Sequence, residues 1–418
     1  MSTAAPDRPD RRHRPAARTR AMGRALFRGV YRWIVTGSMT SAAVGIALSV
    51  LGLTLLGCMM VLSASSVEQI RASASPYALF TRQAVFAVIG IAGMFLASRI
   101  PIGFWKHRKV VFLFMGAALV LLALVMSPLG VAIGGNRNWL AFGFIQFQPS
   151  ELAKFAVLLW AAWGLAKSTH VATSVRAALM PSCLGFFLTV ALVMLGGDAG
   201  TAIVFVLIYG GALWFARAPL RIFGVSLLAA AVVGVVIVAS STARIQRVVG
   251  WLAPAQCGAD EVCYQSNAGL AALASGSWWG EGLGQSRQKY NYLPEAHNDF
   301  IFAILGEELG FIGALIVIGL FAILALSLAR VILRSSDRFV RVAAGCVLAW
   351  FVGQAFVNIG MVTGLLPVIG IPLPFISYGG TSLVVSLFTA GFAMSLTRTP
   401  THPAIELSAL EEREPRVD

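Results

Sequence analysis

The chain has 418 residues, of which 58% are hydrophobic and only 12% are charged, and its mean hydropathy is +0.80. A soluble globular protein carries about a quarter charged residues, so this composition excludes a water-soluble globule and indicates a fold surrounded by lipid. The net charge of +14 is unevenly distributed. Nine arginines fall within the first 33 residues, namely Arg8, Arg11, Arg12, Arg14, Arg18, Arg20, Arg24, Arg28 and Arg32.

The arginine-rich segment, residues 1–36, has almost no large apolar residue before Leu26 and is rich in proline and alanine. Such a composition is typical of disordered chain. A basic segment can bind nucleic acid, but beside a first membrane span the positive-inside rule and contact with anionic headgroups explain it better. We therefore predict a cytoplasmic tail that touches membrane lipids, and no nucleic-acid partner.

Ten apolar runs follow that tail, and a run of about 20 apolar residues is enough to cross the hydrocarbon core. We therefore predict an all-α integral membrane domain of ten helices over residues 37–398, followed by an acidic cytoplasmic tail over 399–418. The predicted spans are 40–62, 79–98, 110–129, 151–167, 178–196, 201–216, 222–240, 300–329, 342–365 and 379–396.

The charges between the spans predict the orientation. Bases gather in every second connection, for example Lys106, Arg108 and Lys109, whereas the alternate short connections hold few. By the positive-inside rule both termini are cytoplasmic. This orientation makes residues 241–299, between the seventh and eighth spans, one large extracytoplasmic loop.

The outward loop ends in a cluster of polar residues, including His297 and Asp299, that runs directly into the eighth span. Ionisable groups at the edge of a membrane helix are costly to desolvate unless they have partners, which favours a functional site. Helix capping is the alternative for Asp299. Glu307 and Glu308 follow inside the span and should be hydrogen-bonded or line a polar cavity.

Two other outward segments carry polar residues in distinctive patterns. In the segment 136–154, Glu151 and Lys154 are spaced to pair on one helix face, either as a structural ion pair or to orient a phosphate beside Lys154. The segment 367–382 has three prolines within eight residues, so it cannot be helical throughout. Asp198 lies in a very short outward turn, where capping of the sixth span is the simplest interpretation.

Three long motifs in these segments resemble one family. They read NRNWLAFGFIQFQPSELAK over 136–154, LPEAHNDFIFAILGEELG over 293–310 and LPVIGIPLPFISYGGTS over 366–382. The chain is similar, over about 40–398, to the SEDS proteins (shape, elongation, division and sporulation), which include FtsW and RodA. The second motif and the basic extension are most like the FtsW branch, which acts in septal cell division.

The resemblance implies a peptidoglycan glycosyltransferase of the bacterial cytoplasmic membrane that polymerises lipid II and works with a class B penicillin-binding protein and other divisome proteins. The family's proposed general base is an aspartate in the large outer loop, ahead of a Tyr-Gln pair. The corresponding stretch ends in Tyr264-Gln265, but the usual slot holds Cys257, so the nearest acid, Asp260, is the predicted base, with Glu261 and Asp299 as the next candidates.

The predicted reaction also needs positive charge for the lipid diphosphate, from basic side chains or from a divalent cation such as Mg²⁺ or Mn²⁺. A disulfide between Cys257 and Cys263 is expected if the loop lies outside. A lipid II flippase or a divisome scaffold remains open, since neither needs a base in the loop. The predicted substrate-binding residues are Arg137, Glu151, Lys154, Arg287, Lys289, His297, Asp299 and Ser377.

Overall fold

The computed structural model describes most of the chain between residues 38 and 399. The described residues are 38–133, 136–142, 145–168, 171, 173–180, 182–226, 234, 239, 242–252, 261–289 and 295–399.

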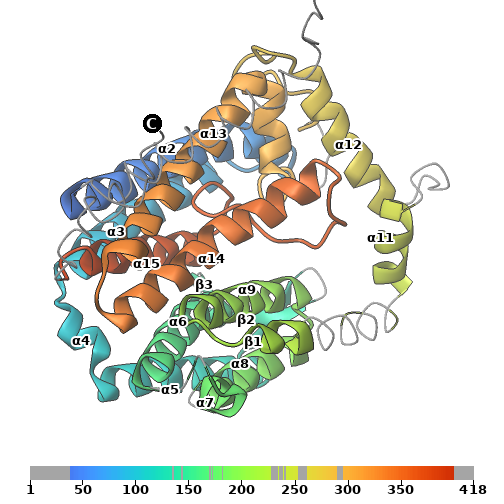
Figure 1. The fold of residues 1–418 in the computed structure, drawn as a ribbon. Helices are drawn as coiled ribbons and strands as arrows, with labels where there is room; N and C mark the ends of the chain where they lie inside the picture. The colour runs from blue at the N-terminus through green and yellow to red at the C-terminus, as the bar shows by residue number, and fades with distance from the viewer. Residues whose placement is uncertain are drawn as a thin grey trace, which may run out of the picture.

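The described chain is mostly helical, and its longer helices pack into one bundle (Figure 1). Short helices connect or flank the long ones. The helices are α2 (Met39–Arg71), α3 (Ala78–Arg99), α4 (Ile102–Lys106), α5 (Arg108–Val125), α6 (Pro149–Lys167), α7 (Val175–Leu179), α8 (Cys183–Leu195), α9 (Ala199–Phe215), α11 (Thr242–Leu252), α12 (Glu261–Ser275), α13 (Ile301–Arg334), α14 (Arg338–Val362) and α15 (Gly380–Leu396).

Five of these helices, α2, α3, α5, α13 and α14, are long and apolar enough to cross a membrane, and α8, α9 and α15 are shorter apolar helices. Nine of the ten predicted spans coincide with a helix of the described chain. The remaining span, 222–240, falls largely outside the described residues.

The packing of the bundle places α14 at its centre. Helices α2, α3 and α15 pack together on one side and α5, α6, α8 and α9 on the other, while α11 and α12 run along one edge (Figure 1). On α2 the buried residues Ile46, Leu53 and Met60 recur every seven positions, so they share one face of the helix. That face packs inward, whereas Leu48 and Leu55 are exposed and suit contact with lipid.

The segment between α5 and α6 forms a small antiparallel sheet, which departs from the all-α prediction. Its strands are β1 (Gly130–Ile133), β2 (Asn136–Phe142) and β3 (Ile145–Phe147), in the order β1-β2-β3. Trp139 pairs with Val131 and Leu140 with Phe147. The physical reason is that non-helical backbone must still satisfy its N–H and C=O groups, and pairing neighbouring segments does so.

Helix α13 is interrupted at Gly310, which has φ 69° and ψ −168°. The interruption frees backbone groups, and the turn segment 276–282, which follows α12, bonds to them. Phe311 N donates to Ser277 O at 2.9 Å, and Glu281 N donates to Glu307 O at 2.9 Å. The chain after α12 is thus joined, backbone to backbone, to a helix long and apolar enough to cross a membrane.

The close approach at this junction requires glycine. A Cβ on Gly310 would overlap the backbone at Gly280 and Trp278, and its φ and ψ lie in a region that only glycine occupies readily.

We expect Gly310→Ala to lower the unfolding free energy by about 1–3 kcal/mol. Thermal denaturation in detergent measures this. Gly319→Ala, in an open position of the same helix, is the matched control, and an equal melting temperature for the two variants would contradict the assignment.

Candidate functional site

The turn before α13 carries Asp299 and is held in place through its main chain. Tyr378 N donates to His297 O at 3.0 Å, and the Ser377 hydroxyl donates to Asn298 O at 2.7 Å. The Asn358 amide donates to Asp299 O at 2.8 Å. The motifs 293–310 and 366–382 therefore meet, and their contact leaves the carboxylate of Asp299 unused.

The proline-rich segment 367–379 is folded by side chains from its neighbours. Gln354 donates to Pro372 O at 2.7 Å, and Asn358 donates to Ile371 O at 2.7 Å. Prolines prevent regular helix here, so these amides replace the missing backbone bonds. Ser377, a predicted substrate contact, is nearly buried, and its hydroxyl both donates to Asn298 O and accepts from Leu373 N.

The carboxylate of Asp299 is half-buried against Gly370, where a Cβ would lie 3.2 Å from Oδ2. Burial above all, together with the negative charges of Glu295 and Asp198, raises the pKa of Asp299 to about 7, although the positive charge of Arg247 acts to lower it. Among the described residues, no side chain or amide donates a hydrogen bond to this carboxylate. A carboxylate with a pKa near neutrality can accept and release a proton under physiological conditions.

Asp198 caps α9, as predicted, and it also acts electrostatically on Asp299. Its Oδ1 accepts from Thr201 N at 2.8 Å, as an N-cap of α9 should. Its Oδ2 accepts from the Asn138 amide on β2 at 2.8 Å, and Arg137 N donates to Gly196 O at 2.9 Å. The small sheet and the start of α9 are therefore tied together beside Asp299. Arg137 itself is exposed and donates to Ser127 O at 2.7 Å.

His297 lies at the rim of the same site. Its Nδ1 is 3.2 Å from Glu68 Oε2 near the C-terminal end of α2, and its ring packs edge-on against Tyr378 with the centroids 5.8 Å apart. These contacts join α2 to the motif that carries Asp299. They leave Nε2 of His297 without a hydrogen bond to any described residue.

Glu151 and Lys154 form a buried ion pair within α6, as the sequence predicts. The Lys154 Nζ to Glu151 Oε1 distance is 2.8 Å, and the residues are only 1% and 2% exposed. Lys154 Nζ also lies 5.6 Å from the ring centre of Trp350. Glu151 Oε2 and Ser150 Oγ are buried and have no hydrogen-bond partner in the described part of the chain, so the pair retains unused acceptor capacity.

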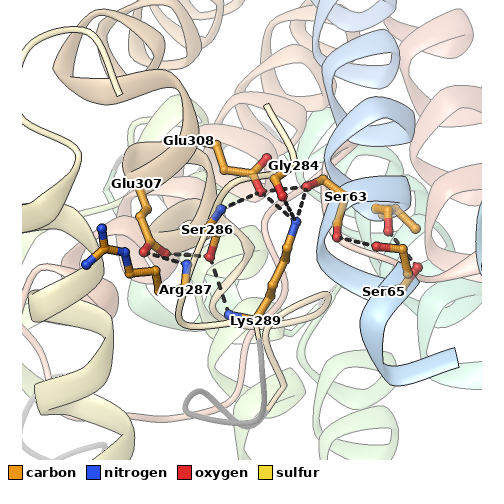
Figure 2. A network of polar contacts seen from close by, with 10 residues as sticks. Ser63, Ser65, Gly284, Ser286, Arg287, Lys289, Glu307 and Glu308 are labelled. Carbon is orange, nitrogen blue, oxygen red and sulfur yellow. Dashed lines mark hydrogen bonds and ion pairs between the residues drawn. The ribbon is translucent and has the colours of Figure 1, made fainter. Parts of the chain in front are cut away.

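Lys289 and Arg287 differ in how free their charges are. The Lys289 ammonium donates to Gly284 O and to the Glu308 carboxylate, and the residue is 7% exposed (Figure 2). Arg287 is exposed; its backbone N–H donates to Glu307, whereas its guanidinium bonds to none of the described residues. Of these two, Arg287 has the charge available for an anion.

The predicted base and disulfide fall in an undescribed stretch. Asp260 and Cys257 lie outside the described residues, as do the side chains of Glu261 and Cys263, so both predictions stay predictions. Sequence reasoning missed Arg247 on α11, which acts electrostatically on Asp299. The available signal was a basic residue near the start of the polar loop 241–299, directly after the seventh predicted span.

Metal binding was tested against the side chains present. No group of three or more His, Cys, Asp or Glu residues in the described ranges is placed to hold a metal ion. Mg²⁺ often binds through one or two carboxylates together with substrate phosphates. Asp299 and Asp198 could supply such ligands, so a divalent cation remains a prediction.

Comparison with known proteins decides the family. The family model described as "Cell cycle protein", which spans FtsW, RodA and SpoVE, matches residues 44–402. The chain belongs to this family. The three motifs that carry the site, 136–154, 293–310 and 366–382, all lie inside the matched range.

Curated members of the FtsW/RodA/SpoVE family are similar along most of the chain. A "Probable peptidoglycan glycosyltransferase FtsW" from Mycobacterium tuberculosis is 40% identical over 361 residues, which cover 86% of this chain and 68% of that protein. The stage V sporulation protein E of Bacillus subtilis is 35% identical and covers 87% of this chain and 99% of that one. The family and the apolar helices establish a multi-pass membrane protein.

Solved structures of the family share the fold. The RodA crystal structure from Thermus thermophilus is 26% identical, has a TM-score of 0.62, and covers 85% of this chain and 96% of its own. A structure described as structural coordination of polymerization and crosslinking by a peptidoglycan synthase complex is 27% identical, with a TM-score of 0.70 and coverage of 85% and 97%.

The raised pKa of Asp299 predicts a pH dependence of stability. An unfolded aspartate ionises near pH 4, whereas Asp299 in the folded chain ionises near pH 7. The folded state therefore binds an extra proton between these values, and its stability falls as pH rises from about 4 to about 7. Melting temperatures of wild type and Asp299→Asn measure this, because the variant should lack that part of the decline. Parallel curves for the two proteins would contradict the pKa.

Proposed function

We propose that this peptidoglycan glycosyltransferase polymerises lipid II into β-1,4-linked glycan strands at the outer face of the membrane, during septal wall synthesis. The observation that carries the proposal is the carboxylate of Asp299, half-buried at the edge of α13 with a pKa near neutrality. The relatives named as peptidoglycan glycosyltransferases support the activity.

The reaction needs one base and one anion site. The acceptor's 4-hydroxyl must lose a proton as its oxygen attacks the anomeric carbon of the donor, and one carboxylate can take that proton. The leaving group is a lipid diphosphate, which departs without a protonating acid, unlike the leaving group in glycoside hydrolysis. Direct displacement converts an α-linked donor into a β-linked product.

Two carboxylates compete for the role of base. The family resemblance points to Asp260 in the outward loop. The geometry supports Asp299, because its pKa lies close to physiological pH and its oxygens are not bonded to any described donor. Arg247 beside it would stabilise the ionised form, and Glu295 and Asp198 would favour return of a proton.

The diphosphate needs cationic partners, and Arg287 and Arg137 are exposed bases at the outward segments. Lys154, Lys289, Glu151, His297 and Ser377 are the other predicted substrate contacts. Of these, Lys154 and Lys289 already face carboxylates, so they would bind a phosphate only together with those acids or after a rearrangement. A divalent cation would supply further positive charge between the carboxylates and the diphosphate.

The full proposal has ten membrane helices with both termini in the cytoplasm, which places 241–299 and Asp299 on the cell-wall side. The basic connections support this orientation. The similar solved structure, which is described as a peptidoglycan synthase complex, supports a class B penicillin-binding protein as partner, with other divisome proteins around it. The expected site is the septal cytoplasmic membrane of a bacterium.

A flippase for lipid II is the alternative with a specific observation in its favour. The Glu151–Lys154 pair is buried inside the bundle on α6 and has an unused carboxylate oxygen, as a polar path through the bundle would require. A flippase would move lipid between leaflets without forming polymer, and a scaffold would do neither while still binding its partner.

Glycan synthesis from purified lipid II tests the proposal. We expect Asp299→Asn to lower the rate by about 10²–10⁴-fold, since it removes the base, and Asp260→Ala to do so if the loop aspartate is the base instead. Wild-type kcat/KM should rise with pH and level off above about 7 if Asp299 acts as the base.

Glu281→Gln is the matched control, because Glu281 is an exposed acid of the same outward segment. Full activity of Asp299→Asn would exclude that residue as base, and full activity of Asp260→Ala would exclude the other. Lipid translocation without polymer by the wild type would instead establish the flippase.

A further inference from the structure

Five polar residues join the outward loop to two membrane helices, and we call this group the loop lock. They are Ser286 and Lys289 from the loop, Glu307 and Glu308 from α13, and Ser63 from α2 (Figure 2). Glu307 and Glu308 are each 1% exposed, so the lock is removed from solvent. Neither acid takes part in the proposed chemistry.

Glu307 holds the loop from one side. Its Oε2 accepts from the Ser286 hydroxyl at 2.5 Å, and its Oε1 accepts from the backbone N–H of Arg287 at 2.9 Å. Ser286 Oγ in turn accepts from Lys289 N at 3.3 Å. Glu307 thereby holds residues 286 and 287 directly and residue 289 through Ser286.

Glu308 holds the loop from the other side and also bonds to Ser63 on α2. Its Oε1 accepts from the Ser63 hydroxyl at 2.6 Å, from Lys289 Nζ at 3.3 Å and from Ser286 N at 3.4 Å. Lys289 Nζ also donates to Gly284 O at 2.5 Å. Figure 2 shows Ser63, Gly284 and Glu308 gathered around this ammonium group.

Fold stability alone is a weak explanation for the lock. A buried ion pair often contributes no more stability than apolar residues of the same size, because both charges lose their hydration. What such a network supplies is a single arrangement, because breaking any one bond leaves a buried charge without a partner. The backbone junction at Gly310 already attaches the loop to α13, so the lock adds orientation to an existing attachment.

The position of the lock along the chain says what it orients. Lys289 precedes Asp299 by only ten residues. Beyond that stretch, His297, Asn298 and Asp299 are held by Tyr378, Ser377 and Asn358. The described residues are thus held on both sides of 290–294, residues 286–289 by the lock and residues 297–299 by the proline-rich segment and α14.

We propose that the loop lock is a positioning device for the reaction: Lys289, bound to Glu308 and Ser63, holds residues 286–289 against the N-terminal part of α13, the helix that follows Asp299, and so fixes the surroundings in which Asp299 meets the substrate. This inference rests on the proposed function. It makes Lys289 and Glu308 positioning residues whose loss slows the chemical step while substrate binding is largely kept.

Lipid II polymerisation by Lys289→Gln, Glu308→Gln and the double variant tests the lock. We expect each single variant to lose about tenfold or more in kcat with KM changed by less than about twofold, because small misplacements of a reacting group have effects of this size. The double variant should have a kcat no lower than that of the less active single variant, since the two residues act as one unit. Glu281→Gln should keep wild-type kcat.

Hydrogen exchange of the same proteins in lipid nanodiscs separates positioning from unfolding. Exchange should rise in 276–289 while α3 and α14 stay protected. A raised KM with unchanged kcat would make Lys289 a substrate contact and overturn the proposal, as would faster exchange with unchanged kcat, or independent losses that multiply in the double variant.

Ser286→Ala provides a milder variant should Lys289→Gln fail to fold. It removes only one hydroxyl and should lower kcat by a smaller factor, again without raising KM; unchanged kcat in this variant would overturn the proposal. Absence of polymer from the wild-type protein would instead remove the proposed function, which keeps the two failures distinct.

Discussion

The constraint on which the structure depends is that backbone polar groups within a membrane must find partners in the protein. Helix α13 is broken at Gly310, and the segment 276–282 bonds to the backbone that the break exposes. The break therefore holds residues 276–282 against α13. This is the helix that begins two residues after Asp299, so the junction and the candidate site share one element.

The same scarcity of water distinguishes Asp299 from the buried charges of the bundle. Lys154 faces Glu151, and Lys289 faces Glu308, so each of these buried charges has an opposite charge within bonding distance. Asp299 is surrounded differently: the negative charges of Glu295 and Asp198 raise its pKa, and the positive charge of Arg247 lowers it. An acid held in this balance keeps its proton up to neutral pH and gives a base of useful strength when it ionises.

Sequence was a good guide where physical signals are strong and local. Apolar length predicted the helices, and three-residue spacing predicted the Glu151–Lys154 pair. The small sheet was missed because its short strands lack clear alternation, and pairing depends on what lies opposite. The surroundings of Asp299 could not be predicted, because Asp198, Arg247 and Gly370 come from three distant segments. The sequence correctly predicted that Asp198 caps α9, but it did not indicate that Asp198 acts electrostatically on Asp299.

Desolvation, together with the charges of two nearby acids, raises the pKa of Asp299 to about 7. Infrared difference spectroscopy of the protein in nanodiscs measures this most directly, from the protonated carboxyl C=O band that is present in the wild type and absent from Asp299→Asn. We expect this band to disappear with a midpoint near pH 7. A midpoint near pH 4, the ordinary value for an aspartate, would contradict it.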